Sequence, residues 1–115
     1  MLFLCHFSIR ERIKSMRKKI QDALLELGVT PSLKGFSYIC DAVEMINKEG
    51  RIKVTYIYDK IARDNNEKMM CVERAIRNAI QHVNEETWKS IGGGTGLKNS
   101  EFLYTLELIT REEVK

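Results

Sequence analysis

Apolar residues recur along this chain at steps of three and four, the spacing that places them on one side of an α-helix. The pattern predicts one long helix from Ile9 to Leu27, others at about Lys34–Glu49, Lys53 or Thr55 to Arg63, and Glu67–Val83, and a last one beginning near Asn99. Residues 84–91, around Trp88, are predicted to form a short helix or an irregular turn. Since the chain contains one proline and seven glycines, a turn-rich β fold is disfavoured. We therefore predict an all-α fold, a compact bundle of about six helices.

The periodic apolar positions predict which residues form the core. They are Ile9, Ile13, Met16, Ile20, Ala23, Leu24 and Leu27, then Phe36, Ile39, Cys40, Val43 and Ile46, then Val54, Tyr58, Ile61 and Ala62, then Val72, Ala75, Ile76, Ala79, Ile80 and Val83, and finally Phe102, Leu103, Leu106 and Ile109. Gly28 and Gly50 are predicted to end the first two helices. Ser32 is the expected cap of the second helix, and Asn99 or Ser100 the expected cap of the last.

The length of 115 residues fits one domain, spanning 1–115, with residues 1–8 expected to be a frayed N-terminal segment. That apolar start is far too short to span a membrane, and it lacks the features of a signal peptide. Three cysteines without a CxxC pair argue against a disulfide framework or a zinc site and fit a reducing cytosol. We expect a cytoplasmic protein with no membrane association.

The net charge of +3 is unevenly distributed. Residues 1–20 and 51–82 are basic, whereas residues 21–50 and 83–115 are acidic, which suggests a positive face of the kind that binds nucleic acid. The outer face of the first helix carries Arg10, Arg12, Lys14, Arg17, Lys18 and Lys19. These residues are either a phosphate-contacting or linker face or, as we favour, a solvated helix face.

Two short helices joined by the polar turn Asp64–Asn66 match the plan of a helix-turn-helix. In the second of them, Glu73, Arg77 and Gln81 recur at four-residue steps and Arg74 and Asn78 flank them, so all five are expected opposite the apolar stripe. Arginine can donate two bonds to guanine, glutamate can accept one from cytosine, and asparagine or glutamine can pair with adenine. An exposed Glu73–Arg77 ion pair on a plain surface helix is the alternative interpretation, and both can hold together.

We predict that Glu73, Arg74, Arg77 and Asn78 contact bases in the major groove. Lys60, Asn66, Lys68 and Gln81 are the expected phosphate contacts. No metal-ligand spacing is present, and the loop from Gly92 to Gly96 lacks the strand and the lysine of a phosphate-binding loop. The only histidines, His6 and His82, do not suggest catalysis. We expect no metal, no cofactor, no small-molecule substrate and no enzymatic activity.

Several runs of residues resemble one known family. They are Leu27-Gly28-Val29-Thr30-Pro31, Lys34-Gly35-Phe36, Tyr38-Ile39, Ala42-Val43, Ile61-Ala62, Asn66, Val72-Glu73-Arg74-Ala75-Ile76-Arg77-Asn78-Ala79-Ile80 and Asn99-Ser100-Glu101-Phe102. In this order they resemble the C-terminal effector domain of the master sporulation response regulator of spore-forming bacteria, over roughly residues 20 to 110. The resemblance covers nearly the whole chain.

The resemblance implies a six-helix transcriptional regulator that reads a short promoter box containing G and C, usually as tandem copies or a dimer, and that contacts the sigma subunit of RNA polymerase. It places Glu73, Arg74 and Arg77 at the base-facing positions. The chain departs from the family pattern at Met70-Cys71, where Ser-Arg is usual, at Asn78, and at Glu67 and Lys68. It also shows no receiver domain, so it is either an excised domain or a stand-alone relative. The departures motivate an alternative function, a protein-interaction module that dimerises with or antagonises a full-length regulator without productive DNA binding.

Overall fold

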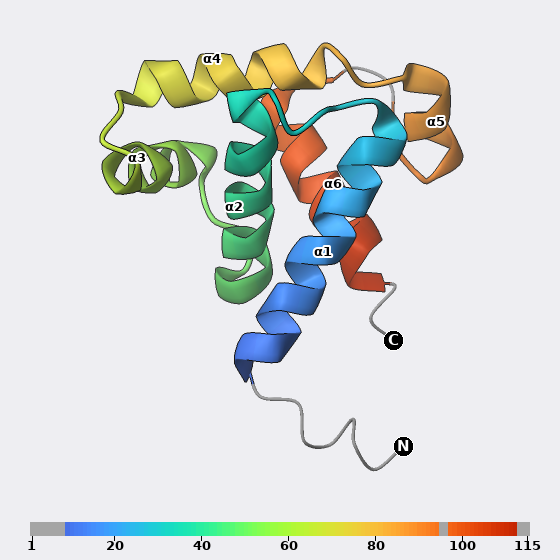
Figure 1. Ribbon diagram of the computed structural model, residues 1–115, viewed down its shortest axis with the longest axis horizontal. Coiled ribbons are helices and arrows are strands. Elements are labelled where there is room, and N and C mark those ends of the chain that lie inside the picture. The colour runs from blue at the N-terminus through green and yellow to red at the C-terminus, as the bar shows by residue number, and fades with distance from the viewer. Residues whose placement is uncertain (1–8, 95–96, 113–115) are drawn as a thin grey trace.

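The computed structural model describes the backbone of residues 9–94 and 97–112, and the side chains of residues 16–94 and 97–111. Within these ranges the chain has six helices and no strand, so the predicted all-α bundle is confirmed (Figure 1). The helices are α1 (Ile9–Leu27), α2 (Lys34–Glu49), α3 (Val54–Asp64), α4 (Met69–Ile80), α5 (Glu85–Ser90) and α6 (Asn99–Glu112). The expectation that residues 1–8 fray lies outside the described residues.

Helix α2 lies at the centre of the bundle and packs against α1, α3, α4 and α6 (Figure 1). Its predicted inner face is confirmed, since Ile39, Cys40 and Val43 have no exposed surface. The predicted stripes of the other helices are also buried or half-buried wherever their side chains are described. The pattern did not include Ile57, which is fully buried on α3.

Helix α4 is shorter than predicted at both ends, because the flanking residues make other backbone hydrogen bonds. At its start, Asn66 has a φ of 54°, and the Glu67 N–H donates to the carbonyl of Ala62, so both residues close the end of α3. This left-handed closure is a Schellman motif. At the other end, Val83 donates to the Ile80 carbonyl in a tight turn, and the Asn84 N–H donates to the Leu27 carbonyl of α1 at 2.8 Å.

Two predicted helix caps are wrong. Leu33, with extended backbone angles, occupies the N-cap position of α2, while the Ser32 hydroxyl bonds to that of Thr30 at 2.9 Å. Asn99 is the first residue of α6, and its side chain reaches other helices instead of capping its own. The segment around Trp88 is a short helix, capped by the Asn84 side chain, which accepts from the Thr87 N–H.

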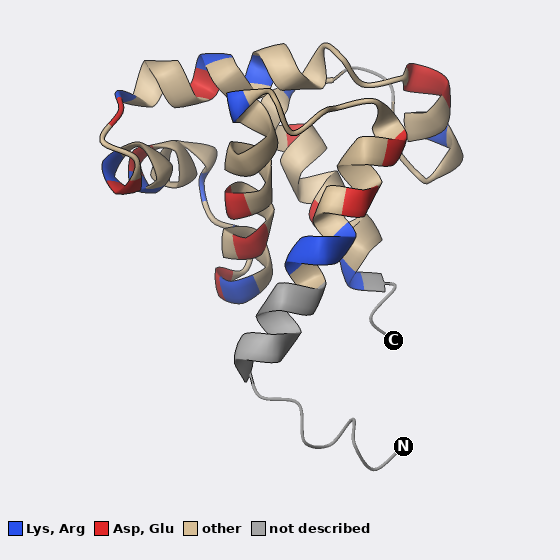
Figure 2. Cartoon of the chain, viewed as in Figure 1, with Lys and Arg blue, Asp and Glu red and all other residues tan. Residues whose placement is uncertain are grey.

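The predicted outer face of α1 is described only from Arg17 onward, since the side chains of Arg10, Arg12 and Lys14 lie outside the described residues. Arg17 is half-buried and pairs with both Asp41, at 2.9 Å, and Glu44 of α2. These ion pairs join α1 to α2. They lie more than one helical turn from Gly35, the residue of α2 at which α4 crosses, so Arg17 stabilises the packing of α1 on α2 and is not part of the α4 surface. Arg17 is therefore paired within the fold, and in Figure 2 the described basic residues of α1 lie well away from α4.

Candidate nucleic-acid interface

Helices α3 and α4 form a helix-turn-helix whose turn spans residues 65–68. Val72, Ile76, Ala79 and Ile80 anchor α4 to the core. Where α4 crosses the start of α2, the backbones almost touch, since a Cβ added to Gly35 would lie 2.2 Å from the Ala75 carbonyl oxygen. Only glycine permits this approach. The crossing fixes which face of α4 is turned outward.

The outward face of α4 carries a line of exposed residues, which we call the α4 strip. It consists of Met70, Arg74, Arg77, Asn78 and Gln81, spaced three or four positions apart. Residues at this spacing lie above one another along a helix. Three of the four predicted base-contacting residues, Arg74, Arg77 and Asn78, are therefore brought together on one exposed surface.

Glu73, the fourth, does not project with them. Its side chain is 36% exposed at the edge of the α4 strip, and its carboxylate accepts a bond from Arg77 at 2.6 Å. Its backbone carbonyl accepts a hydrogen bond from the Asn99 side chain of α6 at 3.2 Å. Glu73 therefore orients Arg77 from the side, which corrects the expectation that it lies directly opposite the apolar stripe.

The predicted phosphate contacts are distributed around α4. Lys68 is the exposed N-cap residue of α4, Asn66 is exposed in the turn, and Gln81 is the C-cap residue. Lys60 lies on α3 and pairs with Asp64 at 2.8 Å. That hydrogen bond and the charge of Asp64 raise the pKa of Lys60. The lysine therefore stays protonated, and its positive charge is already balanced by the Asp64 carboxylate.

The first turn of α4 is suited to an anion. It contains no acidic residue, and no side chain caps its N–H groups. These groups and the helix dipole give a helix N-terminus a partial positive charge. The nearest carboxylate, Glu67, is bound by Lys34 of α2 at 3.2 Å, and the same bond raises the pKa of Lys34. Figure 2 shows basic residues along α4 and at this end of α2.

The sequence pattern did not predict two residues, Asn99 and Lys34, that hold the helix-turn-helix in place from other helices. The Asn99 amide donates to the Tyr58 hydroxyl of α3 at 3.0 Å as well as to the Glu73 carbonyl, so it joins three helices. Lys34 is likewise brought to Glu67 only by the crossing of α2 and α4. Neither pairing produces a periodic signal along the chain, because the partners are more than 25 positions apart.

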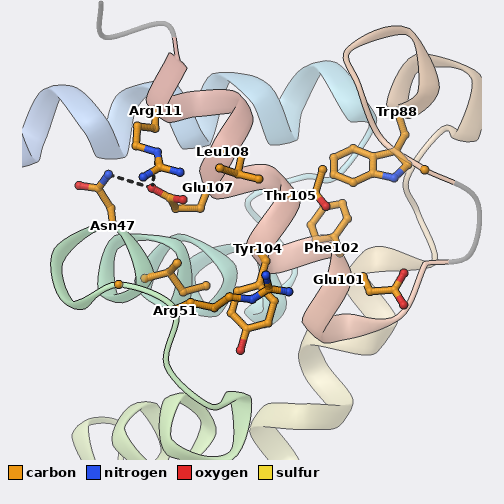
Figure 3. A pocket seen from close by; sticks show the side chains of 13 residues that line it. Asn47, Arg51, Trp88, Glu101, Phe102, Tyr104, Thr105, Glu107, Leu108 and Arg111 are labelled. Carbon is orange, nitrogen blue, oxygen red and sulfur yellow. Dashed lines mark hydrogen bonds and ion pairs between the residues drawn. The ribbon is translucent and has the colours of Figure 1, made fainter.

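A separate hollow of about 430 Å³ lies between the end of α2 and α6 (Figure 3). Several of its polar groups are paired with each other: the buried Glu107 carboxylate accepts from Asn47 at 3.0 Å and pairs with Arg111 at 3.4 Å. Arg51 lies over the Tyr104 ring, 4.7 Å from its centroid. Glu107, Arg111 and Arg51 therefore all have partners within the fold.

The described part of the chain has no group of three or more His, Cys, Asp or Glu residues that could hold a metal ion. No helix in the same range has the length and apolar character needed to cross a membrane.

The family model for "Sporulation initiation factor Spo0A C terminal" matches residues 20–107. The matched range includes the helix-turn-helix, the α4 strip and Asn99, and it covers most of the chain. No curated protein matches the chain. The family is one of DNA-binding regulatory domains and not of enzymes. The chain belongs to the Spo0A C-terminal family of DNA-binding effector domains involved in sporulation.

Proposed function

We propose that this chain regulates transcription by binding a specific duplex DNA sequence with α4 in the major groove. The α4 strip supports this most directly, because it presents Arg74, Arg77 and Asn78 from the second helix of a helix-turn-helix. Arg74 is exposed and suits bidentate bonding to guanine. Arg77 approaches the bases already oriented by Glu73, and Asn78 suits adenine.

Contacts to phosphates would position α4 in the groove. Lys68, Asn66 and the uncapped first turn lie at the N-terminal end of α4, and Gln81 lies at its C-terminal end. Lys60 would have to leave Asp64 to join them, so we assign it the weakest contribution. Phosphate contacts supply affinity without sequence information.

Two partners belong to the proposal on the strength of family membership alone. One is a second copy of the chain on a repeated box, and the other is the sigma subunit of RNA polymerase. A footprint that covers two adjacent boxes would support the first. Retention of purified sigma subunit by the DNA-bound chain, but not by free DNA, would support the second.

Selection of bound duplexes from a random library, with the full chain, tests the central proposal. Arg74→Ala should weaken binding to the selected duplex by about 1–3 kcal/mol and binding to a scrambled duplex very little. Arg63→Ala is the matched control, because Arg63 is an exposed arginine of α3 paired with Asp59. Equal losses on both duplexes with Arg74→Ala would refute direct base readout.

Salt dependence separates phosphate contacts from base contacts. Affinity should fall as salt rises, and Lys68→Ala should reduce the slope of log K against log salt by about one. If no duplex is shifted at low salt, the DNA-binding proposal fails. Co-purification with a related full-length regulator would then support the interaction module in its place.

A further inference from the structure

The recognition helix begins with apolar side chains that the fold leaves in solvent. Met70 is 60% exposed, more than any other large hydrophobic residue in the described part of the chain, and the neighbouring Met69 is 39% exposed. Exposed apolar surface is costly in water, and adjacent exposed hydrophobic residues often mark a binding surface. Met70 does not pack into the core, so its side chain is available to contact a partner.

Met70 is the first residue of the α4 strip, one helical turn before Arg74. This is the N-terminal half of the second helix, the part that a helix-turn-helix presents to base edges. A thioether side chain cannot form the strong hydrogen bonds that read amide and carbonyl edges. The only apolar group that the four bases expose in the major groove is the 5-methyl group of thymine. Methionine is flexible and polarisable, which suits it to such an irregular surface.

The charges around Met70 favour DNA over a protein as the occupant. Lys68 precedes it, Arg74 follows it, and the first turn of α4 has no acidic residue. The two nearby carboxylates are both paired with a cation, Glu67 with Lys34 and Glu73 with Arg77. An apolar side chain framed by cations complements a thymine methyl group framed by phosphates.

We propose that Met70 contacts the 5-methyl group of a thymine in a base pair next to the one read by Arg74. Met70 is then a specificity-determining residue that selects thymine over cytosine at one position of the target. This inference rests on the proposed function, since it requires α4 to lie in the major groove.

The test uses the full chain and the duplex recovered by selection, with each thymine replaced in turn by deoxyuridine. This replacement removes only the methyl group. One position should lose about four-fold in affinity, the value of one buried methyl group. Met70→Leu should keep this sensitivity, whereas Met70→Gln, similar in length but polar, should abolish it. Leu25→Ala, which truncates a hydrophobic residue 50% exposed on α1, should leave the sensitivity unchanged.

Three results would overturn the assignment. One is that no thymine is sensitive to loss of its methyl group. Another is that Met70→Gln weakens binding equally to the thymine and deoxyuridine duplexes. The third is that Met70→Gln changes the sedimentation of the free chain, which would assign Met70 to self-association. Arg74→Ala separates the two proposals. If Arg74→Ala weakens binding to the selected duplex but not to the scrambled one, while no thymine is sensitive to loss of its methyl group, only the role of Met70 fails.

Discussion

Asn99 donates a hydrogen bond to the backbone carbonyl of Glu73, 3.2 Å away on α4. The same amide donates to Tyr58 on α3, so one side chain at the start of α6 touches both helices of the helix-turn-helix. Glu73 in turn holds Arg77 through its carboxylate. A continuous set of contacts therefore runs from the interior of the bundle to an arginine of the α4 strip.

Removal of the Asn99 amide should loosen α4 on the bundle. Asn99→Ala should lower the free energy of unfolding by about 1 kcal/mol, the net value of such hydrogen bonds. It should also reduce the preference for selected over scrambled DNA, which a purely structural role would not do. Urea unfolding and fluorescence anisotropy measure the two effects. Tyr58→Phe, which keeps the bond to Glu73, should leave the preference intact, and a loss equal to that of Asn99→Ala would contradict the role of that bond.

Glu73→Gln should free Arg77 while changing stability by only a few tenths of a kcal/mol, about the value of an exposed i,i+4 pair. Affinity for scrambled duplex should rise, because one negative charge near the phosphates is lost. Discrimination for the selected duplex should fall, because Arg77 is no longer oriented. Titrations of both duplexes at one salt concentration give the ratio, and an unchanged ratio would show that Glu73 does not orient Arg77.

Gly35→Ala should disrupt the crossing of α2 and α4. The new Cβ would lie 2.2 Å from the Ala75 carbonyl oxygen and 2.6 Å from the Ala79 Cβ, and neither is a flexible chain end. The cost should be about 1–3 kcal/mol or more, as in other overpacked cores. Thermal unfolding measures it. Gly94→Ala is the matched control, because nothing lies within 4 Å of that position, and a similar loss there would refute the steric explanation.

Alkaline pH should destabilise the fold through Cys40. Burial raises the pKa of its thiol from 9.0 to about 12. The folded state therefore binds the thiol proton more tightly than the unfolded state. The contribution of this proton to the free energy of unfolding is fully present below pH 9 and is lost as the pH rises toward 12. By pH 10 the loss of unfolding free energy from this group should be on the order of 1 kcal/mol. Urea unfolding at pH 8 and pH 10 measures this loss. The free energy of unfolding should decrease less between the two pH values in Cys40→Ala than in the unsubstituted chain. Cys71→Ser, at an exposed cysteine, should behave as the unmodified chain.

Local pattern predicted the helices and most of the core, because burial follows the three- and four-residue spacing within each helix. It also predicted that Arg74, Arg77 and Asn78 share an exposed face of α4. It misplaced Glu73 and Asn99, because their environments depend on where α6 meets α4. It misjudged Arg17 for the same reason, since Asp41 and Glu44 reach it from another helix. The predicted α4 was too long at both ends, because Glu67 bonds back to α3 and Val83 bonds to Ile80 in a turn.

The hydrogen bond from the Asn84 N–H to the Leu27 carbonyl ties the segment after α4 to the end of α1. Together with the crossing at Gly35 and the amide of Asn99, it holds α4 at its middle and just beyond its C-terminal end. A helix restrained in this way loses little conformational entropy when it meets its target, so less of the contact energy is spent on ordering the protein. The adjustment must come from the other partner. Under the proposed function, target sequences should differ in affinity by how easily the double helix bends and changes its groove width to fit a rigid α4, including at base pairs that no side chain touches.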